Sequence, residues 1–145
     1  MSVEQFDGSV HLGISAVLVR YASGIDRRDW DLFRSCFIPE CKVDYGEIGT
    51  WNGVDEITAF MVSVHEHCGY TLHRISNVSV ERLPEGARAQ SYVDAVIMGP
   101  DNVDGVRAIG FYDDQLVHSG RGGWQIARRH FTTVHVGTVG QGALG

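Results

Sequence analysis

The sequence predicts an α+β fold, with helices packed on one face of a curved antiparallel sheet. Up to about residue 69, the apolar side chains recur mainly at helical spacing, with two short strands between the helices. After that point, four long β-rich segments follow one another, separated by strong turn signals. The chain of 145 residues has the usual size of one domain, so we expect a single domain over residues 1–145.

The first predicted helix spans about residues 9–25 and is followed directly by Asp26. A carboxylate is disfavoured there, because the C-terminal end of a helix carries partial negative charge. This unfavourable position makes Asp26 a candidate functional residue. The apolar face of the helix consists of Val10, Ile14, Val17, Leu18, Tyr21 and Ile25.

Shorter elements come next. The segment "RDWDLFRSCF" predicts a second helix with Trp30, Phe33 and Phe37 turned inward, and Pro39 is expected to end it. "CKVDYGEIGTWNG" alternates weakly and contains three glycines, which indicates two short strands around a turn. "VDEITAFMVSVHEHCG" returns to the helical period, with Gly69 as its expected end. The apolar side of this third helix is formed by Val54, Ile57, Phe60, Met61 and Val64.

The last part of the chain predicts four strands: "YTLHRISNVSVERL", "ARAQSYVDAVIMG", "VRAIGFYDDQLVHS" and "GWQIARRHFTTVHV". They are separated by the turn signals "PEG", "GPDNVDG" and "GRGG". The ends of the chain, about residues 1–8 and 138–145, are expected to be mobile termini.

Alternate residues of a strand point to opposite faces of the sheet, so parity decides which side chains share a surface. In the last strand, only one of Arg128 and Arg129 can face inward, and the sequence does not say which. In the first of the four strands, one face is shared by Thr71, His73, Ile75 and Asn77.

Composition excludes several classes of partner. The net charge of -6 gives no attraction to phosphate backbones or anionic membranes, so we expect neither nucleic acid nor a membrane as a partner. No apolar run approaches the roughly 20 residues that cross a bilayer, and the acidic N-terminus lacks the pattern of a signal peptide, which favours a cytoplasmic location. The three cysteines have no CxxC spacing, so reduced thiols are expected.

Motifs for metals and cofactors are also missing from the sequence. His65 and His67 are two residues apart on a helix, so they project in different directions and lack the spacing of HExxH. There is no GxGxxG after a strand, no Walker A motif and no GxSxG elbow. We therefore expect no metal and no cofactor.

His73 is the best candidate for proton transfer, because histidine alone has an unperturbed pKa near physiological pH. Such a base is usually oriented by a carboxylate, and Asp26 is a candidate for this partner. A purely structural interpretation stays open, in which His73 is an ordinary strand residue and Asp26 caps a turn.

Further polar residues are candidates for substrate contact. Tyr21, Tyr45 and Asn77 could hold a substrate oxygen, or satisfy groups within the fold. Arg129, if it faces inward, carries a buried charge that needs a carboxylate, a substrate oxyanion or a leaving group beside it.

Four patterns, "YASGIDRRDWDLFRSCF", "VDYGEIGTWNG", "HRISN" and "GGWQIARRHF", occur in this order between about Val10 and His135. In this arrangement the chain resembles the SnoaL-like, scytalone-dehydratase-like branch of the nuclear transport factor 2-like superfamily. The resemblance implies a cone: a strongly curved antiparallel or mixed sheet, with three helices on one side enclosing an apolar pocket. It also implies self-association as a dimer or trimer.

The same resemblance implies roles for single residues. Asp26 and His73 match an Asp/His dyad, in which the histidine removes a proton from carbon and the aspartate orients it. Arg129 matches a basic position near the leaving group, and Tyr21 and Tyr45 match regions that supply pocket tyrosines. The expected apolar lining comprises Phe60, Met61, Val93, Ile97 and Phe111, with Asn77 beside His73.

On this basis, we expect a cofactor-independent lyase of the dehydratase type that eliminates water or another leaving group from a small apolar cyclic substrate. An isomerase or polyketide cyclase is an alternative, and a steroid-isomerase-like site would need Asp94 or Asp113 as its base. A non-catalytic ligand-binding or partner subunit, similar to a dioxygenase β subunit, is a further alternative.

Overall fold

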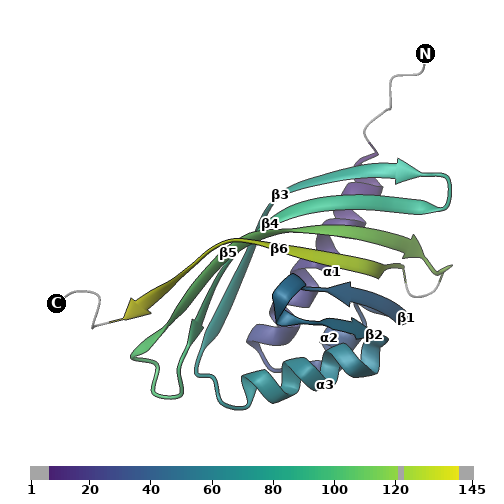
Figure 1. The fold of residues 1–145 in the computed structure, drawn as a ribbon. Coiled ribbons are helices and arrows are strands. Elements are labelled where there is room, and N and C mark those ends of the chain that lie inside the picture. Colours follow the sequence, from purple (N-terminus) through teal and green to yellow (C-terminus); the bar gives the residue numbers. More distant parts are fainter. Residues whose placement is uncertain (1–6, 121–122, 141–145) are drawn as a thin grey trace.

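The computed structural model describes residues 7–120 and 123–140, and it has the predicted α+β class (Figure 1). The helices are α1 (Gly8–Asp26), α2 (Trp30–Arg34) and α3 (Val54–His65), with a 3-10 turn η1 (Gly46–Ile48). The strands are β1 (Phe37–Asp44), β2 (Thr50–Asn52), β3 (Thr71–Leu83), β4 (Gly86–Met98), β5 (Asp104–His118) and β6 (Trp124–Gly140).

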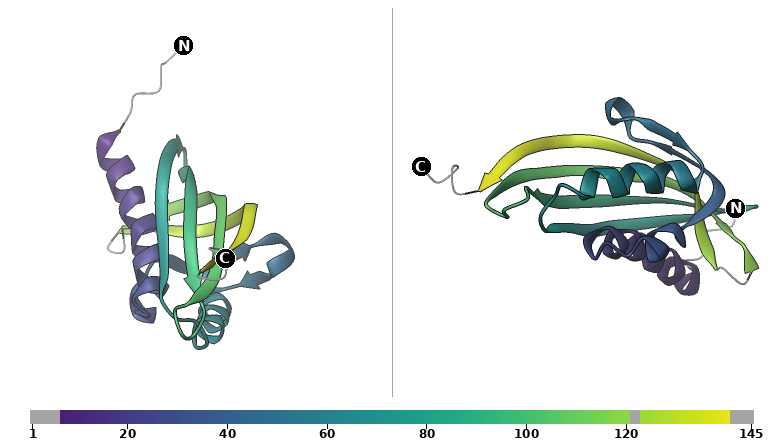
Figure 2. Two further views of the ribbon diagram at one scale, coloured as in Figure 1. Left: turned by 90° about the vertical axis from the view of Figure 1, so that its left-hand side faces the viewer. Right: turned by 90° about the horizontal axis from the view of Figure 1, so that it is seen from below.

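The strands form one mixed sheet in the order β2-β1-β6-β5-β4-β3. β1 runs parallel to β6, whereas the other neighbours are antiparallel. The sheet does not close, and its long strands bend over the helices, which lie together on its concave side (Figures 1 and 2). α1 packs along β3 and α3 packs against β1, so the concave face is walled by helices on two sides.

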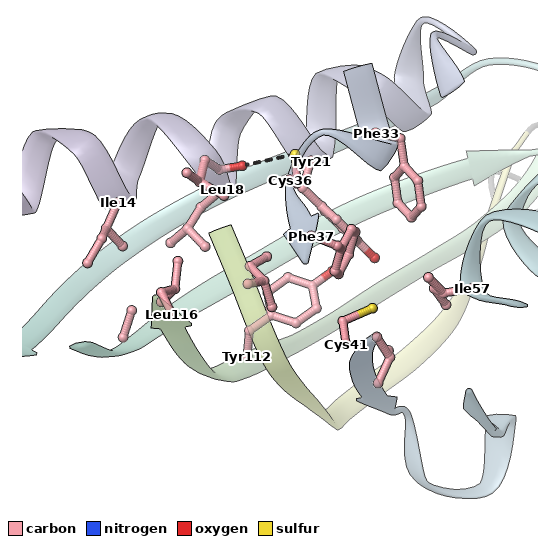
Figure 3. Close-up of a cluster of buried hydrophobic side chains, with 14 of the residues drawn as sticks. Ile14, Leu18, Tyr21, Phe33, Cys36, Phe37, Cys41, Ile57, Tyr112 and Leu116 are labelled. Carbon is pink, nitrogen blue, oxygen red and sulfur yellow. Dashed lines mark hydrogen bonds between the residues drawn. The ribbon is translucent and has the colours of Figure 1, made fainter. Parts of the chain in front are cut away.

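The core lies between α1 and the concave face of the sheet. α1 begins at a cap, where the side chain of Asp7 accepts from the backbone N–H groups of Ser9 and Val10. Figure 3 shows Ile14 and Leu18 of α1 pointing toward the strands, where they are completely buried. Burial of this apolar stripe holds the last turn of α1, and with it Asp26, at a fixed place over the sheet.

A glycine allows the close approach between α1 and α2. A Cβ atom on Gly24 would lie 2.8 Å from the backbone nitrogen of Phe33, so a larger residue would push the two helices apart. This contact sets the direction in which the chain leaves α1, two residues before the end of the helix at Asp26.

Two helix ends differ from their predicted positions. α2 ends at Arg34, and Phe37 and Pro39 belong to β1, so Pro39 does not terminate a helix. The cause is tertiary pairing: the carbonyl oxygen of Cys36 already accepts from the backbone N–H of Ile126 in β6. α3 ends at His65, before Gly69, whose N–H donates to the carbonyl of Met98.

The expected mobile termini fall largely outside the described residues, which exclude 1–6 and 141–145. Within the described part, Asp7 and Gly8 cap and begin α1, and residues 138–140 extend β6 as a paired strand. No helix in the described ranges combines the length and the apolar character needed to cross a membrane.

Candidate functional site

Asp26 and His73 lie in direct contact where the end of α1 meets the beginning of β3. The ring Nδ1 of His73 is 2.7 Å from Oδ1 of Asp26, and the backbone N–H of His73 donates to Oδ2 at 2.8 Å. Because a carboxylate accepts, the hydrogen of the neutral ring resides on Nδ1 and the lone pair on Nε2. Both side chains are largely enclosed, with exposed fractions of 20% for Asp26 and 11% for His73.

Donors from β3 compensate the unfavourable position of the Asp26 carboxylate at a helix end. The hydroxyl of Thr71 donates to Oδ1 of Asp26 at 3.0 Å. Burial alone would raise the pKa of Asp26, but the hydrogen bonds from the ring and the backbone of His73 and from Thr71 hold that pKa below its ordinary value. Asp26 is therefore ionised at neutral pH.

Arg28, which the sequence analysis did not identify as a candidate, stabilises this arrangement through hydrogen bonds. Its guanidinium donates to the hydroxyl of Thr71 at 2.9 Å and to the carbonyl of Gly69 at 2.7 Å, and it also caps the carbonyl of Ile25. A hydrogen-bonded chain thus runs from Arg28 through Thr71 to Asp26. A basic residue just after a helix is favoured by the helix dipole, and that was the available sequence signal.

His73 opens onto a cavity of about 300 Å³ on the concave side of the sheet. Most of the wall is apolar, and its polar groups are two imidazoles and three phenols. The lining residues are Tyr21, Tyr45, Ile48, Phe60, Met61, Val64, His65, His73, Val93, Ala95, Ile97, Val106, Ala108, Tyr112 and Phe131.

Strand geometry places two of the predicted substrate contacts away from this cavity. Phe111 faces the outer side of the sheet, where it borders a separate hollow with Tyr92 and Val134, because its neighbour Tyr112 faces the cavity. Asn77 is exposed and sits at a β-bulge with φ 52°, where the pairing of β3 with β4 skips between Ser76 and Ser79. The remaining predicted lining residues, Tyr21, Tyr45, Phe60, Met61, Val93 and Ile97, all border the cavity.

The strand parity of β6 turns Arg129 inward and leaves Arg128 exposed. Arg129 forms a bidentate ion pair with Asp114, with Nε to Oδ1 at 2.7 Å and Nη2 to Oδ2 at 3.0 Å. Its guanidinium carbon lies 4.2 Å from the ring centre of Tyr21 and 3.7 Å from that of Tyr112. The partner of Arg129 is thus a carboxylate of this chain, and Arg129 lies behind the tyrosines, outside the cavity lining.

The tyrosine hydroxyls form the polar end of the cavity. Those of Tyr21 and Tyr45 are hydrogen-bonded to each other, and burial raises the pKa of Tyr21, Tyr45 and Tyr112 well above the ordinary value. The phenols therefore stay protonated at neutral pH and can donate hydrogen bonds. Tyr112 was missed because parity in β5 could not be assigned from the sequence.

His65 also borders the cavity, on the wall supplied by α3. The sequence analysis considered it only as a metal ligand, together with His67, which is exposed. Its position four residues after Met61 was the signal for a shared helix face. In the described ranges, no group of three or more His, Cys, Asp or Glu side chains is placed to hold a metal ion.

The aspartates of a steroid-isomerase-like site point away from the cavity. Asp94 accepts two hydrogen bonds from Arg107, at 2.9 and 2.8 Å, and Asp113 accepts one from Gln90 at 3.0 Å. Neither aspartate is a lining residue, so neither can serve as a base for a ligand bound there.

Comparisons with known proteins agree with this architecture. The uncharacterized protein Rv2910c of Mycobacterium tuberculosis is 30% identical over 125 residues, covering 83% of each chain. Scytalone dehydratase of Colletotrichum orbiculare is 43% identical over 35 residues, which are 24% of this chain and 19% of that enzyme.

Solved structures share the fold. A candidate scytalone dehydratase from Novosphingobium aromaticivorans has a TM-score of 0.81 at 20% identity, covering 90% of this chain and 91% of that one. A type 2 hexachlorocyclohexane dehydrochlorinase, LinA, has a TM-score of 0.82 at 13% identity, covering 92% and 90%. Residues 10–130 match the SnoaL-like domain, and the chain therefore belongs to the SnoaL-like domain family.

Proposed function

We propose that the protein is a cofactor-independent lyase of the dehydratase type. It would remove a proton from a carbon next to an activating group and expel a leaving group from a small, apolar, cyclic compound. The observation that carries the proposal is the hydrogen bond between Asp26 and Nδ1 of His73, which leaves the lone pair of Nε2 for the apolar cavity that His73 borders.

In this mechanism, Nε2 of His73 takes the proton from carbon. The carboxylate of Asp26 holds the ring in the required tautomer and stabilises the imidazolium that forms. Positioned general-base catalysis of this kind contributes about 10²–10⁴-fold in rate. The bonds from Thr71 and the His73 backbone keep Asp26 ionised and in place for this role.

The tyrosines would stabilise the charge that develops on the activating group. The hydrogen-bonded pair of Tyr21 and Tyr45 presents protonated phenols to the cavity, where a carbonyl oxygen becomes negative as the proton leaves carbon. The charge of Arg129 behind the ring of Tyr21 favours negative charge at this end of the cavity. Arg129 would thus act through the tyrosines, without contact with the leaving group.

The substrate class follows from the size and the lining of the cavity. A volume of about 300 Å³ with mainly apolar walls suits a compound of one or two rings with few polar groups. The short match to scytalone dehydratase and the fold shared with a dehydrochlorinase support an elimination reaction. The same fold also occurs in ActVI-ORFA of Streptomyces coelicolor, with a TM-score of 0.75.

An elimination assay tests the proposal. Small cyclic β-hydroxy ketones are incubated with the protein, and formation of the conjugated enone is followed by ultraviolet absorbance. We expect Asp26→Asn and His73→Gln each to lower turnover by about 10²–10⁴-fold, because each removes part of the general base.

The chain offers a matched control for this assay. Asp44 and His130 form a second Asp–His pair at 3.4 Å, and it is half exposed on the outer face of the sheet. Asp44→Asn and His130→Gln should leave turnover unchanged. Equal activity of the wild type, Asp26→Asn and His73→Gln would overturn the proposal, and ligand binding without turnover would identify a non-catalytic binding module.

A further inference from the structure

His65, the last residue of α3, is held in one orientation at the wall of the cavity. Its ring Nδ1 lies 2.7 Å from the carbonyl oxygen of Met61, one turn earlier in the helix. A carbonyl oxygen only accepts hydrogen bonds, so the hydrogen of the neutral imidazole is on Nδ1 and the lone pair is on Nε2. The ring also packs against Trp30, with 5.9 Å between the ring centres, and 8% of the residue is exposed.

The surroundings keep this imidazole neutral. Burial lowers the pKa of His65, and the nearby positive charge of Arg28 acts in the same direction. The bond to the Met61 carbonyl and the charge of Asp26 oppose this effect without reversing it. At neutral pH, Nε2 of His65 therefore carries a lone pair and can accept a hydrogen bond, while the hydrogen on Nδ1 stays with the Met61 carbonyl.

The cavity wall thus contains two imidazoles that can accept hydrogen bonds at Nε2, and they differ in the group that is bonded to Nδ1. Nδ1 of His73 is hydrogen-bonded to the carboxylate of Asp26, whereas Nδ1 of His65 is hydrogen-bonded to a backbone carbonyl. In the described part of the chain, no side chain or backbone N–H donates to Nε2 of His65. An acceptor in a mainly apolar wall is stabilised when a ligand brings a donor to it.

We infer that His65 is a positioning residue that accepts a hydrogen bond from a hydroxyl group of the substrate, and that the leaving group is this hydroxyl. The inference rests on the proposed lyase function and narrows it to dehydration. A halide at the same position has no hydrogen to offer, so it would leave Nε2 of His65 without a partner.

The dehydration step balances without another reactant. Nε2 of His73 takes the proton, and the electron pair of the C–H bond forms the C=C bond. The C–O bond breaks with its pair on oxygen, and the oxygen takes the proton from His73 and departs as water. During this sequence His65 only accepts from the hydroxyl hydrogen, which leaves the oxygen lone pairs free to face His73.

A binding experiment tests the role of His65 without turnover. The probes are 2-naphthol and 2-fluoronaphthalene, which are similar in size and differ in the hydroxyl donor, and calorimetry gives the Kd of each. We expect the wild type to bind 2-naphthol about 5- to 10-fold more tightly, the value of one neutral hydrogen bond. His65→Phe should bind both probes equally, and His67→Phe, altered at the exposed neighbour, should behave like the wild type.

Nitrogen-15 NMR of the wild type gives a second readout that needs no variant. Addition of 2-naphthol should shift the Nε2 resonance of His65, whereas 2-fluoronaphthalene should leave it unchanged. A preference that survives in His65→Phe, or failure of 2-naphthol to bind more tightly than its fluoro analogue, overturns the inference. These outcomes leave the Asp26–His73 proposal standing, because that proposal depends on the separate elimination assay.

Discussion

At the scale of single residues, Arg129 shows how a buried charge is accommodated in this fold. The side chains of Arg129 and Asp114 are both fully enclosed, so each depends on the other for neutralisation. Removal of one partner from such a pair leaves an uncompensated charge in the interior. The rings of Tyr21 and Tyr112 add cation–π contacts, which place the guanidinium against the polar end of the cavity.

We expect Asp114→Asn to lower the free energy of unfolding by about 3–5 kcal/mol, because Arg129 would lose its buried counter-ion. Urea unfolding followed by circular dichroism measures this change. The control is Asp94→Asn at an exposed Asp–Arg pair with Arg107, where solvent screens the charges and a much smaller change in the free energy of unfolding is expected. Equal effects of the two substitutions would contradict this account of the buried pair.

At the scale of elements, β3 carries the bulge that separates its two halves. Residues before the bulge, including His73 and Ile75, alternate with exposed positions, and Val78 and Val80 resume the inner face after it. The backbone of Asn77 is left-handed there, a conformation that asparagine and glycine tolerate better than other residues. The bulge therefore sets which side chains of β3 reach the interior.

Substitution at this position tests the role of the bulge. Asn77→Val should destabilise the protein by about 1–2 kcal/mol, because a β-branched side chain is strained at φ 52°. Asn77→Gly relieves that strain and should be close to the wild type in thermal unfolding. A valine variant as stable as the wild type would show that the bulge shifts to another residue.

The elements also show how far the sequence could predict the structure. The periodicity of α1 placed Ile14, Leu18 and Tyr21 on the buried face, and the order of helices and strands was predictable because each long segment keeps one period. Phe111 and Asn77 were misplaced, since parity depends on register and bulges that arise from pairing between distant strands. Arg28 reaches Thr71 and Gly69, and His65 reaches Trp30, only when separate elements meet, and no local pattern encodes those distances.

At the scale of the whole molecule, the contact between Asp26 and His73 links the stability of the domain to pH. The pKa of Asp26 is lower in the folded protein than its ordinary value of about 3.9 in an unfolded chain. The unfolded state therefore binds more protons in this range, and stability increases with pH. This contribution is fully present above about pH 5 and is lost as the pH falls through the folded pKa.

Asp26→Asn should consequently weaken the dependence of stability on pH. Between about pH 5 and pH 2, the free energy of unfolding should fall less steeply for the variant than for the wild type, because the amide does not titrate. Urea unfolding at a series of pH values measures both slopes, and their difference isolates Asp26 from the other carboxylates. Parallel curves would show that the folded protein does not stabilise the charged form.

The parallel pairing of β1 with β6 also has a consequence for the order of folding during synthesis. Phe37 is the register partner of Ile126, and α3 and three long strands of the sheet lie between them in the chain. β1 can therefore pair with β6 only after the last strand has been translated, whereas α1 and α2 can form early from local contacts. A nascent chain that stops before β6 would expose the edges of both β1 and β5, and such a fragment is expected to aggregate.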